Sequence, residues 1–243
     1  MVVAVATAFL SGAAAAQSSP RPAPAGAYER MKSQIEDETG VRYSMNVSVL
    51  TQLGAPGGTY AVTQAMFTPN VDWKAFDDPG FGAGSFQFHY LAVHYWTVAD
   101  AGGLAARLDL NTPLNAYPTD TKFFRQVSYT HRLPGDWLTV TLGQYPFASF
   151  DGNAYANDQQ VGFISNSMSQ NGSQNYSKAS LGAYGQVEPS RNVAFAAGVH
   201  EGQNLTGHYI QFDKIGQGPY AWFLYGAWSP DFGSGRGSYA LFY

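Results

Sequence analysis

Apolar and polar residues alternate over Val41–Leu53, and this pattern constrains the fold more than any other feature of the chain. Side chains of a strand point alternately to its two faces, so the segment predicts a strand with one apolar and one polar face. The same alternation is found at 104–110, 138–143 and 179–187, and further strand candidates lie at 59–68, 84–96, 122–133, 193–200, 219–228 and 237–243. The sequence therefore predicts an all-β chain.

The composition favours a barrel wall in a membrane. Charged residues make up 12% of the chain, against roughly 25% in soluble domains, while aromatic residues make up 15% and there are 27 glycines. Half of the strand residues of such a wall face lipid, which disfavours charge. After the first few positions the chain has no apolar run of about 18 residues, which excludes a helical membrane protein. The absence of Cys excludes a thiolate metal site, and a net charge of −4 gives no reason to expect nucleic acid as a partner.

The links between the predicted strands differ in length in a regular way. Short links at 54–58, 99–103, 134–136, 188–192 and 229–236 alternate with long ones at 69–83, 111–121, 147–177 and 201–218. Short turns on one side and long loops on the other are typical of outer-membrane barrels, whose short turns face the periplasm. Aromatic residues gather near the predicted strand ends, as in the girdles of such barrels. The predicted fold is a transmembrane antiparallel β-barrel of the porin type in the bacterial outer membrane.

The ends of the chain divide it into three parts. Residues 1–16 read as a signal peptide, with a short apolar core followed by small residues at Ala14–Ala16; an Ala-rich buried helix is the alternative. Residues 17–40 read as a linker and a short helix, and 41–243 as the barrel. With short turns in the periplasm, the strand 237–243 runs outward, whereas both termini of a complete barrel lie in the periplasm. The sequence predicts ten strands. A barrel of about 8 strands is filled by side chains, and about 16 strands are needed for an aqueous channel, so we expect this chain to be an N-terminal part of a larger barrel.

The segment Phe147-Ala-Ser-Phe-Asp-Gly-Asn-Ala-Tyr-Ala-Asn-Asp-Gln-Gln160 resembles the signature region of the OprB-type carbohydrate-selective porins. The segments 181–198 and 220–243 are similar to that family too. The resemblance implies a barrel of about sixteen strands, which is the size that leaves an aqueous channel. It also implies an inward-folded loop that narrows the pore, and passive diffusion of glucose and other small saccharides.

Two sets of residues are candidates for the pore constriction. The loop 147–177 carries amides, carboxylates and aromatic rings suited to sugar hydroxyls and ring faces, namely Phe150, Asp151, Asn153, Tyr155, Asn157, Asp158 and Gln159. A solvated surface loop is the alternative. Arg107 and Asp109 share the polar face of the predicted strand 104–110, and Arg125 is expected to face inward from the next strand. Such charges would create a transverse field in a pore; a solvated cross-strand pair is the alternative.

No other set of residues indicates chemistry. His89 and His94 are five residues apart on a predicted strand, so they point to opposite faces and cannot share a metal ion. Asp77 and Asp78 precede Pro79, which is typical of a turn. We therefore expect no enzyme activity, no catalytic residue, no metal and no cofactor. The expected partners are small saccharides and outer-membrane lipid, and the sequence leaves a homotrimer open. The rivals are an outer-membrane channel for other small solutes and a soluble, secreted carbohydrate-binding β-sandwich.

Overall fold

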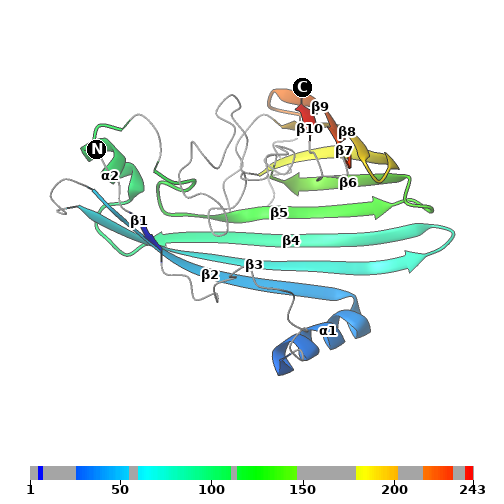
Figure 1. The fold of residues 1–243 in the computed structure, drawn as a ribbon, viewed down its shortest axis with the longest axis horizontal. Coiled ribbons are helices and arrows are strands. Elements are labelled where there is room, and N and C mark those ends of the chain that lie inside the picture. The colour runs from blue at the N-terminus through cyan, green and yellow to red at the C-terminus, as the bar shows by residue number, and fades with distance from the viewer. Residues whose placement is uncertain are drawn as a thin grey trace.

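A computed structural model describes residues 5–7, 26–54, 60–110, 114–146, 179–201, 216–231 and 239–242, and shows one antiparallel sheet (Figure 1). Its ten strands follow one another in chain order without a crossover. They are β1 (Val5–Thr7), β2 (Val41–Leu53), β3 (Ala61–Asp78), β4 (Gly82–Tyr95), β5 (Thr121–Arg132), β6 (Leu138–Tyr145), β7 (Ser180–Ser190), β8 (Val193–Glu201), β9 (Tyr220–Trp228) and β10 (Tyr239–Phe242).

The alternation of the sequence separates an inner from an outer face of this curved sheet. On β2, Met45 and Val47 point outward and are 62% and 68% exposed, whereas the polar residues on either side of them, Ser44, Asn46 and Ser48, point inward. On β9, Trp222 and Leu224 point outward and Phe223 is buried on the inner face. Paired residues of neighbouring strands share a face, so this assignment extends across the sheet. The outer face is therefore mostly apolar, with polar residues such as His94 and Lys122 near the strand ends, as expected for a lipid-facing wall.

The two ends of the sheet differ as an outer-membrane barrel requires. At one end lie the turns 79–81, 133–137 and 191–192 and the connection 229–238; the connections 54–60, 96–120, 146–179 and 202–219 join strands at the other end. Asp78 shapes the first turn, because its Oδ1 accepts hydrogen bonds from the amides of Gly80 and Phe81, both at 2.8 Å. The short-turn end corresponds to the periplasmic side.

Two predicted connections are corrected by this arrangement. The predicted long loop 69–83 is wrong, because β3 continues to Asp78 and only 79–81 form the turn. Pro69 reads as a strand breaker, but it pairs with Met45 of β2 in an unbroken ladder. The predicted short link 54–58 joins β2 and β3 at the end of the long connections. The sequence pattern placed the short link 54–58 in the periplasm, which would make the strand 41–53 run inward. With both corrections, β2 runs outward from the short-turn end.

The predicted strand 104–110 is also wrong, since Ala101–Arg107 form helix α2. Its N-cap is Asp100, whose side chain accepts a hydrogen bond from the amide of Gly103 at 2.7 Å. A first helix, α1 (Ala27–Thr39), precedes β2 where the sequence predicts a short helix, and it ends at Gly40 in the left-handed conformation. α1 lies at the short-turn end and α2 at the opposite end (Figure 1). Neither described helix has the length and apolarity needed to cross a membrane.

Candidate pore lining

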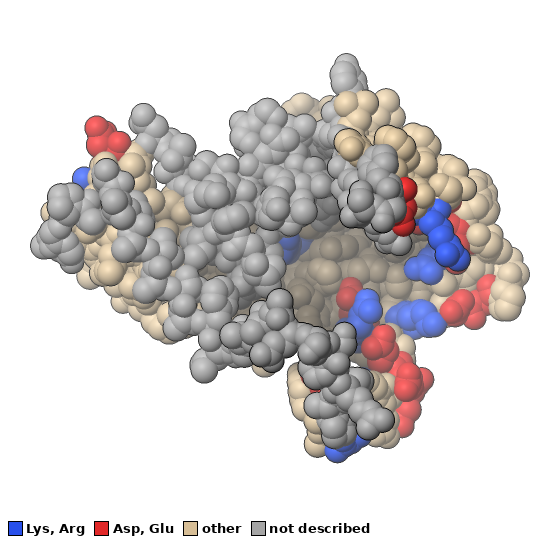
Figure 2. Space-filling view, in the orientation of Figure 1, with Lys and Arg blue, Asp and Glu red and all other residues tan. Residues whose placement is uncertain are grey.

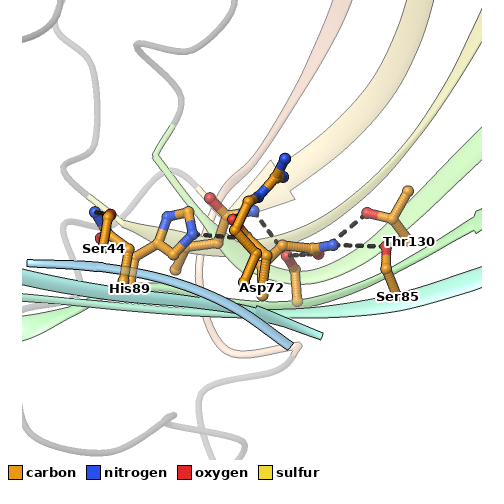
Figure 3. Close-up of polar contacts among 10 residues, drawn as sticks. Ser44, Asp72, Ser85, His89 and Thr130 are labelled. Atoms are coloured by element: carbon orange, nitrogen blue, oxygen red, sulfur yellow. Dashed lines mark hydrogen bonds and ion pairs between the residues drawn. The ribbon is translucent and has the colours of Figure 1, made fainter. Parts of the chain in front are cut away.

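Hydrogen-bonded polar side chains cover the inner face of β4 and β5 (Figure 3). Gln87 lies at the centre of this row: its Nε2 donates to Ser85 Oγ at 2.8 Å, and its Oε1 accepts from Ser128 Oγ at 2.8 Å and from Thr130 Oγ1 at 3.2 Å. Gln126 Nε2 donates to Ser128 Oγ at 2.8 Å. Amides and hydroxyls both donate and accept, so this row offers either kind of partner to a solute that presents hydroxyl groups.

On the same face of β2, β3 and β4, three ionisable side chains lie together. His89 Nε2 lies 3.0 Å from Asp72 Oδ1, and Arg42 Nη2 lies 3.6 Å from Asp72 Oδ2. Beside them, Asn70 Nδ2 donates to Ser44 Oγ at 3.3 Å. Figure 3 shows Ser44, Asp72, His89, Ser85 and Thr130 on one side of the sheet. The inner wall is thus polar in this region, and the Asp72 carboxylate lies between the side chains of Arg42 and His89.

Towards the short turns the inner face opens into a cavity of about 600 Å³. Figure 2 shows red and blue side chains together at this end of the hollow. Two close ion pairs lie here, Lys74–Asp77 at 2.9 Å and Arg132–Asp136 at 3.8 Å. Exposed pairs of this kind contribute at most about 1 kcal/mol each, so they add little to the stability of the fold. The charged lining residues are Glu36, Asp72, Asp77, Asp78 and Asp136 together with Arg42, Lys74 and Arg132.

Towards the long connections the inner face becomes apolar and is covered. We call the described residues of the β4–β5 connection, 96–110 and 114–120, the inner segment. Its α2 helix contributes Ala101 and Leu104 to a buried cluster, and Leu108, Leu114 and Tyr117 pack against that cluster. The strand residues of the cluster lie on the inner faces of β3, β4 and β5; they are Val62, Met66, Leu91, Val93, Tyr95 and Phe123. The inner segment therefore lies against the wall instead of projecting from the sheet.

A fully buried amide joins the inner segment to three strands. Asn115 Nδ2 lies 2.8 Å from Gln52 Oε1, 3.1 Å from the Tyr95 hydroxyl and 3.5 Å from Gln64 Oε1. Asn115 Oδ1 accepts a hydrogen bond from the amide of Tyr117 at 3.0 Å. A buried polar group without partners costs about 1–3 kcal/mol, so these bonds favour one position of the segment on the wall.

A second contact fixes the end of the inner segment just before β5. Asp120 Oδ1 accepts a hydrogen bond from the Tyr95 amide at 2.6 Å, and Asp120 Oδ2 lies 3.0 Å from His94 Nδ1. The Tyr95 amide lowers the pKa of Asp120 below its usual value, burial opposes this shift, and His94 adds a smaller lowering. The carboxylate is consequently ionised at neutral pH and holds the segment next to β4.

Of the predicted charged residues, Arg107 and Asp109 do not lie on a strand. Arg107 ends α2, and its guanidinium lies 4.9 Å from the centre of the Tyr60 ring. Asp109 follows the helix with a φ of 53°. The strand face that would have aligned the two charges does not exist, so their predicted transverse field loses its basis.

Arg125 lies on β5, as predicted, but at an irregular position. His89 pairs with Gln126 and Tyr90 pairs with Phe124, so Arg125 is the extra residue of a β-bulge. The bulge lies where the inner wall changes from polar to apolar. The seven predicted loop residues Phe150, Asp151, Asn153, Tyr155, Asn157, Asp158 and Gln159 lie outside the described residues.

Sequence reasoning missed both Gln87 and Asn115. Gln87 could have been predicted as an inner residue, because it occupies a polar position in the strand candidate 84–96. Asn115 lies in a segment without periodicity, and no local signal marks it as buried. His89 and His94 point to opposite faces, as expected from their spacing, with Asp72 and Asp120 as their respective partners. Within the described ranges, no group of three or more His, Cys, Asp or Glu side chains is placed to hold a metal ion.

Comparisons with known proteins agree with this arrangement. No family model matches the sequence. The chain is 33% identical over 228 residues to Porin AaxA of Chlamydia felis, covering 88% of this chain and 50% of the relative. It is 31% identical over 219 residues to Porin AaxA of Chlamydia pneumoniae, covering 86% and 49%. The chain thus spans about half the length of the curated relatives it matches.

A solved structure shows the same fold. OprB of Pseudomonas putida matches with a TM-score of 0.63 and 12% sequence identity, over 89% of this chain and 54% of that one. The sandwich rival is therefore wrong, because the fold is the antiparallel sheet of a porin barrel. The fold and both similarities place the chain in the bacterial outer membrane and support a porin family for it.

Proposed function

We propose that the chain forms part of an outer-membrane porin that passes small sugars such as glucose by passive, carbohydrate-selective diffusion. It carries out no reaction in this proposal, and the gradient of the solute drives transport. Outer-membrane lipid would contact the outer face, and a homotrimer is the assembly that we propose with it. The resemblance of 147–160 to carbohydrate-selective porins also favours sugar as the solute.

The observation that carries the proposal is the neutral polar row around Gln87. Its members are amides and hydroxyls that already exchange hydrogen bonds with one another at 2.8–3.2 Å. A sugar hydroxyl can replace one of these bonds as it passes, which offsets the loss of its hydration shell. The binding stays weak, as conduction requires, because a tight site would not release its occupant.

A channel for small charged solutes is the second candidate. Its support is the charge of the cavity at the short-turn end, where five acidic residues face three basic ones. That excess favours cations over anions at the periplasmic mouth. Reversal potentials in planar bilayers under a salt gradient distinguish the candidates, since a sugar pore needs no strong preference for either ion.

Liposome swelling with the full-length porin tests the sugar proposal. Glucose and arabinose are compared with an uncharged non-sugar of the same size, and we expect both sugars to enter faster. Gln87→Leu keeps the volume but removes the central amide, so the ratio of sugar to non-sugar entry should fall about 2–10-fold, the value of one hydrogen bond.

The matched control is Val47→Leu on the outer face, which should leave the ratio unchanged. Equal entry of all three solutes into liposomes of the unsubstituted protein would remove the claim of sugar selectivity. A Gln87→Leu ratio equal to that of the unsubstituted protein would show that the row around Gln87 does not act on sugars.

A further inference from the structure

We propose that Asn115 is a positioning residue that holds the inner segment against the wall and so narrows the extracellular half of the bore. This inference rests on the proposed channel function, and it assigns the narrowing to the described β4–β5 connection. The sequence had placed the constriction in the loop 147–177 instead.

The inner face of the sheet beneath the inner segment is apolar, so it is stable only when another part of the chain covers it. A water-filled bore needs a polar inner face, and the inner face is polar around Gln87. Farther along the same strand, however, Leu91 and Val93 point inward and are 0% and 3% exposed. Apolar side chains on an inner wall gain stability only when another element excludes water from them, at about 25 cal/mol per Å². The inner segment supplies that element through Leu104 of α2 and the residues that pack around it.

Apolar packing alone does not fix the position of a segment, whereas hydrogen bonds are directional. Asn115 supplies the direction, because its amide contacts Gln52 of β2, Gln64 of β3 and Tyr95 of β4. Gln52 also donates through Nε2 to the carbonyl of Leu114 at 3.4 Å, and the Tyr95 hydroxyl donates to the carbonyl of Tyr117 at 2.9 Å. If the inner segment moved away from the wall, all of these hydrogen bonds would break at once, and each buried polar group would need a new partner. The segment is therefore a fixed part of the pore wall.

Cysteine labelling tests this position, since the 243 residues contain no Cys. Ser85 and Val93 both point inward from β4, but Ser85 lines the open cavity and Val93 lies under the inner segment. Ser85→Cys and Val93→Cys change little volume. In the full-length porin in proteoliposomes, a water-soluble maleimide should label Ser85→Cys at least about tenfold faster than Val93→Cys. The unsubstituted protein gives the background.

Adding Asn115→Ala to Val93→Cys tests the residue itself. Loss of the buried amide should raise the labelling rate of Val93→Cys about tenfold, as expected for removal of a buried hydrogen-bond partner. Labelling of Ser85→Cys should stay the same, and so should the heat-modifiable migration of the folded barrel on gels. These two controls separate a repositioned segment from a damaged barrel. Single-channel conductance should rise in Asn115→Ala, because the segment no longer narrows the bore.

The outcomes are distinct. If Ser85→Cys is not labelled, no aqueous bore exists and the proposed function fails. If Ser85→Cys and Val93→Cys react at equal rates, the channel stands and the covering segment is refuted; this comparison needs no Asn115 variant. If Asn115→Ala folds but leaves either Val93→Cys labelling or conductance unchanged, Asn115 does not position the segment or the segment does not narrow the pore.

Discussion

Gly198 on β8 shows how closely the inner face is packed between the aromatic rings of neighbouring strands. A Cβ at this position would lie 2.6 Å from Phe223 Cε1, 2.6 Å from Tyr184 Cβ and 2.5 Å from the carbonyl oxygen of Ala183. Phe223 and Tyr184 belong to a second apolar cluster on the inner face. The absence of a side chain at Gly198 therefore allows β8 to pack at its observed distance from β7 and β9.

The prediction at this scale concerns Gly198→Ala. The added methyl group should destabilise the barrel by about 1–3 kcal/mol through overpacking, and the urea midpoint of unfolding, followed by loss of heat-modifiable migration, should fall accordingly. Gly185→Ala is the matched control, because its Cβ would meet only Leu138 Cδ1 at 3.5 Å. Equal midpoints for the two variants would show that the wall relaxes around Gly198.

Among the elements, β5 decides how the inner wall divides into a polar and an apolar part. After the bulge in chain order, Gln126 and Ser128 point inward; before it, Phe123 does so and is fully buried. If Arg125 were a regular strand residue instead of a bulge, the alternation counted from Gln126 would turn Phe124 and Lys122 inward, because a shift of one residue exchanges the two faces of a strand. The bulge at Arg125 thus places an aromatic ring under the inner segment and keeps a charge out of the apolar cluster.

Deleting Arg125 tests the bulge as an element, and Arg125→Ala tests the side chain alone. The deletion makes Phe124 and Gln126 neighbours on opposite faces, so β5 becomes a regular strand that keeps Phe123 inward and Lys122 outward. We therefore expect folded protein in outer-membrane preparations. Arg125→Ala keeps the residue count and should fold with a urea midpoint close to that of the unsubstituted protein. Failure of the deletion variant to fold would mean that the extra residue itself, and not only the pairing on its two sides, is required in β5.

At the scale of the whole molecule, the curved sheet separates two solvents. Its outer face exposes large apolar side chains such as Met45, Trp222 and Leu224, and its inner face carries the polar row and the charged cavity. The outer apolar rings and chains have no other element of the described chain against them, which fits contact with lipid. Short turns at one end and long connections at the other orient the sheet across the membrane.

Leu224→Arg tests the lipid-facing assignment. An arginine near the middle of the lipid face should destabilise the barrel by about 2–4 kcal/mol, measured by reversible unfolding in lipid vesicles. Ser44→Arg on the inner face is the comparison, and its cost should be smaller because the new charge reaches water. If both substitutions cost the same, the outer face does not contact hydrocarbon.

The sequence by itself determined most of the strands, and the two faces of those that alternate without a bulge. Alternation is a local property, so Val41–Leu53 predicts both its strand and the direction of each side chain without reference to its neighbours. The strand candidates 84–96, 122–133 and 193–200 coincide with β4, β5 and β8 to within two residues at each end. The resemblance to porins, drawn from the same residues, agreed with the fold that the solved structure shows.

Only the tertiary structure decided where α2 and Asn115 lie. Leu104 and Leu108 are four residues apart, a spacing that fits a strand face as well as a helix face. The apolar inner wall of β3, β4 and β5 resolves this ambiguity, because it gives one face of a helix a surface to bury against. Asn115 becomes an anchor only when Gln52, Gln64 and Tyr95 converge on it, and such convergence from three strands leaves no trace in the local sequence.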